Sequence, residues 1–190
     1  DVGPPVREFA SPEELCASTG LETTGCAVIH HPLTDGTTCE VVERLSAAAP
    51  GVAVVVVAES PTVARAVQVM RKGAVNVLEW PVANGALRSA VVEALGVAEG
   101  RAARVAAVAR LGRLSPRHTE VLRHLLSGLP NKAVAARLGV GLRTAERLRS
   151  QTLELLGVKT LAEAAELWRD AGGDAARPAA PYAAAGPGQS

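Results

Sequence analysis

The sequence predicts two units in tandem, a parallel α/β sheet followed by an all-helical unit. Three observations support this prediction. In the first half, short β-branched apolar runs alternate with amphipathic helical patterns, as in βαβ units. The second half holds only helical patterns, separated by Gly and Pro. The net charge also divides: residues 1–96 carry six Lys/Arg against eleven Asp/Glu, a net of −5, and residues 97–170 carry thirteen against seven, a net of +6.

Three runs of the first half have the pattern of strands that are buried on both faces. They are Cys26–His30 (CAVIH), Val52–Ala58 (VAVVVVA) and Val75–Glu79 (VNVLE). Continuous apolar runs of this length are typical of parallel sheets, whose two faces are covered by helices. Val6–Phe9 is a candidate for one more strand, leading into a helix near Ser11–Cys16 whose start Ser11 and Pro12 indicate.

Helical patterns occupy the intervals between the predicted strands. The expected helices are Thr38–Ala49, Pro61–Lys72 and Ala83–Leu95, which repeat apolar residues at helical spacing. Gly73 follows the second of them and is expected to be its C-cap. Right-handed crossovers between parallel strands then give a doubly wound sheet. Val97–Arg110, rich in Ala, Arg and Val, is expected to form a connecting helix.

The second half is predicted to be entirely helical. A helix starting at Ser115 and Pro116 is broken at Gly128–Pro130. The elements expected after this break are helix Asn131–Leu138, a tight turn at Gly139–Gly141, helix Leu142–Leu156 and helix Thr160–Arg169. The boundaries that follow are a sheet domain at 1–96, a helical linker at 97–112, a helical domain at 113–170 and a disordered Ala/Gly/Pro tail at 171–190.

Several classes of protein are disfavoured by composition. The longest apolar run, near Val52–Ala58, is too short to span a bilayer, and no signal-peptide pattern is visible. An odd number of cysteines without a C-x-x-C pair favours a reducing compartment, the cytoplasm; they are Cys16, Cys26 and Cys39. Because the chain begins at Asp1 and its only Met is Met70, we expect it to be a processed product or a fragment.

The sequence contains few features that indicate a metal site or a catalytic function. His30 and His31, with Cys26 and Cys39, suggest a metal site, but adjacent strand residues point to opposite faces and would not share one ion. No G-x-S-x-G, P-loop or H-E-x-x-H motif is present. The prediction is therefore a protein that is not an enzyme and that has no metal or other cofactor.

The segment from Leu114 to Leu161 joins a short helix, a glycine turn and a longer helix that carries several arginines. Such a helix fits the major groove of B-DNA. The segment resembles the LuxR/FixJ-type helix-turn-helix of bacterial transcription regulators. The matching motifs are LSPR at 114–117, EVL at 120–122, G-L-x-N-K at 128–132, V-A-x-R-L-G-V at 134–140, R-T-x-E at 143–146 and L-G-V-K-T-L-A-E at 156–163.

This resemblance implies a four-helix domain with Leu142–Leu156 as the recognition helix. It assigns phosphate contacts to Asn131, Lys132, Arg143 and Thr144, and base-facing positions to Glu146, Arg147 and Ser150. Of these, Arg147 suits guanine best. Arg149 is expected to reach a base edge or a phosphate. The sequence departs from the family at Gly141, where a Ser N-cap is usual, and at Leu148, where a His is usual, which is expected to remove a polar contact.

The first half resembles a response-regulator receiver domain, most clearly in the run A-V-x-x-M-x-x-G-A-x-x-x-L-x-x-P at 66–81. Receivers need an acceptor Asp, an acidic pair for Mg²⁺, a Thr or Ser and a Lys. The resemblance implies that the chain begins at the family's second strand, so we expect the sheet to lack the first strand and the acidic pair that it carries. The residues at the three testable positions are His30 for Asp, Ala58 for Thr/Ser and Trp80 for Lys. Asp35 is the nearest carboxylate, but it lies in the following loop. We therefore expect a degenerate receiver without Mg²⁺-dependent phosphorylation.

Together these features predict a phosphorylation-independent regulator that binds specific DNA sequences. The partners implied are double-stranded DNA, a second copy of the chain and RNA polymerase, with no membrane. The receiver resemblance places the dimer surface near Pro61–Glu79. The alternative is a protein-interaction module whose helix-turn-helix does not bind DNA, which Glu146 and Leu148 favour slightly and the +6 charge opposes. Trp80 is expected to fill a gap or to anchor a partner.

Overall fold

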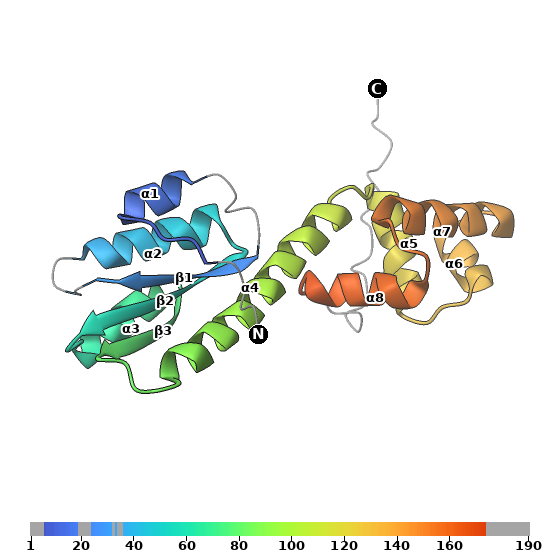
Figure 1. Cartoon of the computed structure of the whole chain (residues 1–190). Coiled ribbons are helices and arrows are strands. Elements are labelled where there is room, and N and C mark those ends of the chain that lie inside the picture. Colours follow the sequence, from blue (N-terminus) through green and yellow to red (C-terminus); the bar gives the residue numbers. More distant parts are fainter. Residues whose placement is uncertain (1–5, 19–23, 32, 34–35, 174–190) are drawn as a thin grey trace, which may run out of the picture. The chain divides into compact units, whose positions relative to one another are not determined.

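The computed structural model describes residues 6–18, 24–31, 33 and 36–173. The chain divides into two compact units, residues 1–103 and 104–190, each with its own hydrophobic core (Figure 1). Their boundary falls inside the range predicted as a linker. Most of the predicted tail, residues 174–190, and the loop residue Asp35 lie outside the described residues.

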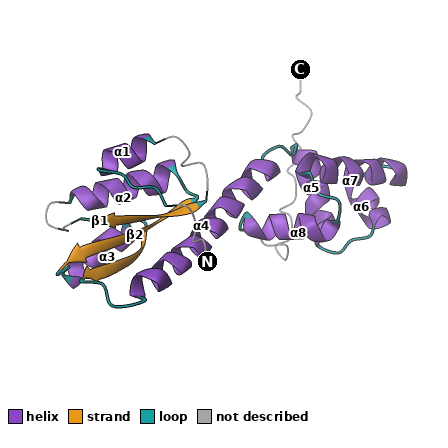
Figure 2. Ribbon diagram, viewed as in Figure 1, coloured by secondary structure: helices purple, strands orange, loops and turns teal. Residues whose placement is uncertain are grey.

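Three parallel strands form the sheet of the first unit, as the sequence predicts (Figure 2). They are β1 (Gly25–His30), β2 (Val52–Glu59) and β3 (Ala74–Trp80), in the order β1-β2-β3 among the described residues. The seven residues Val52–Ala58 of the central strand are all buried. Burial on both faces of β2 explains why its sequence is continuously apolar instead of alternating.

Helices α2 (Thr37–Ala48) and α3 (Val63–Arg71) cover one face of this sheet. Val42 of α2 and Val69 of α3, both fully buried, pack in one cluster with Val54 and Val56 of β2. The short helix α1 (Pro12–Ala17) adds Leu15 to the edge of this cluster. The succession β1-α2-β2-α3-β3 is the parallel βαβ arrangement expected from the alternating patterns.

The other face of the sheet is covered by α4 (Ala86–Leu111) through three buried alanines. Ala90, Ala94 and Ala98 repeat every four residues and pack against Ala53 and Val55 of β2. Helices on both faces confirm the predicted doubly wound class.

Helix α4 corrects one prediction. The sequence predicted two helices, Ala83–Leu95 and Val97–Arg110, whereas the structure has one continuous helix of 26 residues. Gly96 and Gly100 lie inside it, and each glycine costs only about 1 kcal/mol relative to alanine within a helix. Ala94 and Ala98 are fully buried on either side of Gly96, so packing on the sheet favours continuation of the helix.

The strand considered at Val6–Phe9 is absent from the described structure, and this prediction was wrong. The segment belongs to no sheet, and Val6 is 84% exposed. Instead, the Arg7 guanidinium lies 5.1 Å from the centre of the Phe9 ring. An extended segment becomes a strand only when its backbone pairs with a neighbour. The helix predicted after it is confirmed, with the Ser11 hydroxyl accepting a hydrogen bond from the Glu14 amide.

Among the described residues of the second unit, four helices follow the end of α4. They are α5 (Pro116–Leu126), α6 (Asn131–Leu138), α7 (Leu142–Leu156) and α8 (Leu161–Asp170). Each agrees with its predicted range to within one residue at the boundaries the sequence specified. Side-chain caps at Ser115 and Thr160 begin α5 and α8. No helix of the described residues combines the length and hydropathy needed to cross a bilayer.

Candidate nucleic-acid interface

Helices α6 and α7 are joined by the three-residue turn that the sequence predicted. Gly139 ends α6 with a φ of 65°, a left-handed conformation that favours glycine. Gly141 is the N-cap of α7 in an extended conformation and offers no side-chain cap. The turn lets α6 and α7 pack against each other and against α5 around a shared core, which contains Val121, Leu125, Val134, Leu138 and half-buried Leu148.

One side of α7 is fixed in the core and the other side is free. Ala145, Thr152 and Leu156 are buried, and the Thr152 hydroxyl donates to the Leu148 carbonyl at 2.7 Å. The predicted contact residues on the opposite side are exposed: Arg143, Glu146, Arg147 and Ser150. Their spacing of three and four residues places them in one stripe along the helix. A helix with such a stripe can enter the roughly 12 Å major groove while its other side stays packed.

The remaining predicted contact residues lie beside this stripe. Asn131 is the first residue of α6 and is half-buried, and Lys132 beside it is exposed. Thr144 is half-buried in the first turn of α7. Arg149 is also half-buried, on the flank that turns toward the core. The structure therefore separates Arg149 from the exposed stripe.

Two exposed residues of the same stripe were not singled out from the sequence. Gln151 follows Arg147 by four residues, and Glu154 follows Ser150 by four, and both are exposed. Helical spacing from the predicted base-facing positions would have identified them.

Leu148 has a packing role in the structure. It is half-buried against the core of α5 and α6, so the absence of the family's histidine does not leave a gap in the exposed stripe. This position therefore gives no support to the interaction-module alternative.

The charges of the stripe are not neutralised within the described part of the chain. The one ion pair of the helical unit there joins Arg117 to Glu120 at 3.1 Å. Arg143 and Arg147 are in neither of the ion pairs found among the described residues. Exposed guanidinium groups without intramolecular partners are available to phosphates and to the acceptor edge of guanine.

The three receiver positions singled out from the sequence lie at the carboxyl ends of the strands. His30 ends β1 and is exposed, Ala58 lies one residue before the end of β2 and is fully buried, and Trp80 ends β3 with 51% of its surface exposed. The ring centres of His30 and Trp80 are 5.3 Å apart. These three side chains supply no carboxylate acceptor, no hydroxyl and no ammonium for a phosphoryl group.

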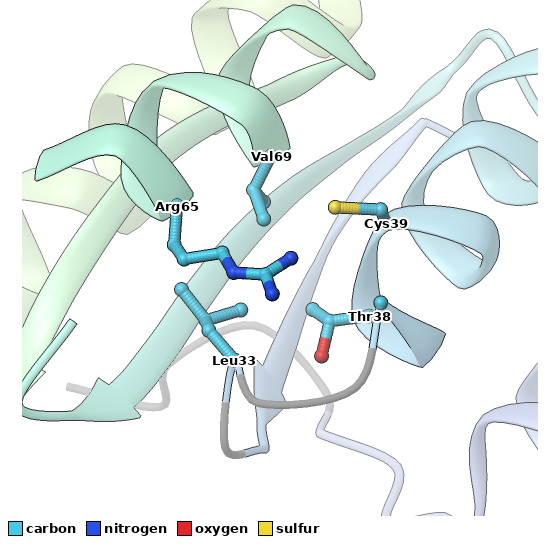
Figure 3. Close-up of a pocket in the computed structure, with 6 residues that line it drawn as sticks. Leu33, Thr38, Cys39, Arg65 and Val69 are labelled. Carbon is cyan, nitrogen blue, oxygen red and sulfur yellow. The ribbon is translucent and has the colours of Figure 1, made fainter. Parts of the chain in front are cut away.

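A small pocket lies near this edge, between the first turns of α2 and α3 (Figure 3). The Arg65 side chain extends from α3 into the space, with Leu33 and Thr38 on one side of its guanidinium and Val69 and Cys39 on the other (Figure 3). Thr38 is 2% exposed, and its hydroxyl lies 2.9 Å from Nδ1 of His31. Because the lining is mostly buried and Arg65 extends into the space, the pocket reflects packing between the two helices.

The cysteines do not form a metal site within the described residues, where no group of three or more His, Cys, Asp and Glu side chains is placed to hold an ion. All three cysteines are free thiols. Burial raises the pKa of the Cys26 thiol, which disfavours its thiolate form.

Comparison with known proteins agrees with both units. Residues 112–168 match the family model for bacterial regulatory proteins of the luxR family (GerE). The chain is 30% identical to the C4-dicarboxylate transport transcriptional regulatory protein DctR of Rhodobacter capsulatus, covering 85% of each chain. It is 31% identical to the transcriptional regulatory protein FixJ of Bradyrhizobium diazoefficiens, covering 83% of this chain and 78% of FixJ.

A solved structure, the response regulator StyR, is 27% identical to this chain with a TM-score of 0.57, covering 85% of this chain and 83% of StyR. A parallel α/β sheet joined to a four-helix unit with an exposed helix-turn-helix defines the response-regulator class of transcription regulator. The chain belongs to the LuxR/FixJ family of bacterial response regulators.

Proposed function

We propose that this protein is a sequence-specific regulator of transcription that binds duplex DNA through α7, acts as a homodimer and does not depend on phosphorylation. The observation that carries the proposal is the exposed stripe of α7. Its arginines lack ion-pair partners among the described residues, and its other side is packed into the helical unit.

The position of each side chain suggests its role. Arg143 and Thr144 lie in the first turn of α7, where free backbone N–H groups and the helix dipole favour a phosphate. Arg147 and Ser150 lie further along the stripe, as expected of groups that read base edges. Lys132, exposed at the start of α6, is suited to a second phosphate. Arg149, on the flank, is suited to a phosphate more than to a base.

Independence from phosphorylation is inferred from the ends of the strands. An aspartyl phosphate needs a carboxylate where His30 stands, and its oxygens need hydroxyl and ammonium partners where Ala58 and Trp80 stand. One such replacement could be compensated by a neighbour, but three together leave no known means of holding the group.

Dimerisation is supported by an apolar stripe on α3. Val63, Val67 and Met70 follow one another at spacings of four and three residues, and 81%, 43% and 48% of their surfaces are exposed. These residues lie inside the region 61–79 that the receiver resemblance indicates. If this face pairs, Val67→Glu with Met70→Glu will convert a dimer to a monomer in light scattering, whereas the exposed polar substitution Gln68→Glu will not.

The experiment that tests the function is selection from random duplex DNA by the full chain, sequenced at two salt concentrations. A recurrent paired or inverted half-site, weakened at higher salt, is the expected result, because phosphate contacts release counterions. Weak binding without sequence preference would contradict sequence-specific regulation. Absence of binding at low salt would instead support the interaction-module alternative.

A further inference from the structure

The turn between α6 and α7 is held from outside by a side chain of α5. Nη2 of Arg117 donates a hydrogen bond of 2.7 Å to the carbonyl of Leu138, the last residue of α6. Nη1 of the same guanidinium donates to Oε2 of Glu120 at 3.1 Å. One planar group thus joins α5 to the turn that leads into α7, with Glu120 orienting it.

The turn has few bonds of its own that could replace this contact. Neither α6 nor α7 has a side-chain cap at its start, because Pro130 and Gly141 occupy the two N-cap positions. At the end of α6, backbone amides of the turn bond to the carbonyls of Ala135 and Ala136. The Leu138 carbonyl receives the Arg117 bond. A cation at the C-terminal end of α6 is also favoured by the helix dipole.

We propose that Arg117 is a positioning residue for DNA recognition, which fixes the angle at which α7 leaves the turn and so aligns its stripe with base edges. This inference rests on the proposed binding of DNA by α7. Arg117 acts through the Leu138 carbonyl and is not itself a base contact. Hydrogen bonds to base edges require accurate placement of α7, whereas long-range attraction to phosphates tolerates a small displacement of the helix. Substitution of Arg117 therefore weakens specific DNA binding far more than non-specific binding.

The test compares Arg117→Met with Arg113→Met in the full chain. Both variants lose one positive charge, and Arg113 is exposed just before α5 with no hydrogen bond from its side chain in the described structure. Affinity is measured for the selected duplex and for a scrambled duplex over a series of salt concentrations. We expect Arg117→Met to bind the selected duplex about tenfold more weakly than Arg113→Met does, with equal affinity for the scrambled duplex and an equal salt slope.

Two further variants keep the test informative if Arg117→Met lowers the thermal stability of the helical unit. Arg117→Lys keeps the positive charge and one donor nitrogen. Its affinity for the selected duplex should lie between those of the wild type and of Arg117→Met. Glu120→Gln keeps the guanidinium, and it should lose less specific affinity than Arg117→Met.

Three outcomes overturn the proposal. Equal affinities of Arg117→Met and Arg113→Met for the selected duplex would show that the contact positions nothing. A parallel loss on both duplexes with a smaller salt slope would make Arg117 a phosphate contact. If wild type shows no preference for any duplex, the proposed function itself fails, and that result is visible before any variant is compared.

Discussion

The two units of this chain each have a buried apolar core but differ in the side chains at their candidate functional surfaces. In the sheet unit, the central strand is buried over seven residues, and near the strand ends lie the exposed imidazole of His30, the exposed indole of Trp80 and the buried methyl group of Ala58. In the helical unit, the core is also intact, and α7 presents arginines and a serine to solvent. The comparison teaches that many apolar contacts determine the fold of a unit, whereas a few polar residues at its surface determine its chemistry, so that the two can change independently.

The largest expected effect is a loss of stability in the helical unit, caused by a substitution in its core. Leu122 is fully buried in a cluster with Leu156 and Leu167, so Leu122→Ala leaves a cavity costing about 2–5 kcal/mol. The helical unit should unfold at lower denaturant concentration and bind DNA more weakly. Urea unfolding followed by far-UV circular dichroism measures the change. Ala136→Gly, at an exposed position of α6, serves as the control and should lower the stability less. An unchanged midpoint would contradict the packing described for this core.

A second substitution tests the exposed surface without touching the core. Arg147→Ala should reduce affinity for the selected duplex by about 1–3 kcal/mol and relax the preference at one base pair. Arg113→Ala provides a charge-matched control outside the stripe. Fluorescence anisotropy measures the affinity of each variant for duplexes that carry each of the four bases at the position Arg147 is expected to contact. Equal losses in both variants would mean that Arg147 contributes only its charge.

A third substitution concerns the start of α7. Gly141 is an N-cap with extended backbone, and a Cβ built there meets nothing within 4 Å. Gly141→Ser should therefore add a cap and stabilise the helical unit by a few tenths of a kcal/mol, roughly the difference between Ser and Gly at this position. Gly139→Ser is the matched contrast, because a φ of 65° strains any side chain, and it should lower the melting temperature. Destabilisation by both would contradict the assigned cap.

The smallest expected effect lies on the surface of the sheet unit. Nζ of Lys72 lies 2.8 Å from Oε2 of Glu43, and this hydrogen bond, with the carboxylate charge, raises the pKa of the lysine. Both side chains are substantially exposed, so the contribution to stability is slight. This contribution to stability is fully present below the pKa of the lysine in the unfolded chain, near 10.5. It is lost as the pH rises through the higher pKa of Lys72 in the folded protein. Glu43→Gln should lower the pKa of Lys72 in an NMR titration; an unchanged value would show that the pair is not formed.

The elements of the fold were largely predictable because local signals and burial agree. The valines of β2, the Gly139–Gly141 turn and the helix start at Ser115 and Pro116 all have the structure that their sequence predicts. The errors occurred where tertiary contacts decide. Gly96 was expected to interrupt the helix, but it lies inside one that buried alanines hold against the sheet, and Val6–Phe9 was considered as a strand but pairs with no other strand among the described residues.

The candidate interface was predictable in composition but not in orientation. The resemblance to the LuxR/FixJ helix-turn-helix indicated α7, while the half-burial of Arg149 and the packing of Leu148 depend on how α7 packs against α5 and α6. The bond from Arg117 to the Leu138 carbonyl joins residues 21 apart in sequence, and no local pattern indicates it.

The most direct test of the account is the affinity of the full chain for its selected duplex, measured with and without acetyl phosphate and Mg²⁺, alongside the intact mass of the protein. We predict specific binding with the same Kd under both conditions and no gain of a phosphoryl group. A phosphoryl adduct accompanied by a change in Kd would contradict the central claim that the sheet unit has lost its phosphotransfer chemistry while the helical unit has kept its DNA-binding surface.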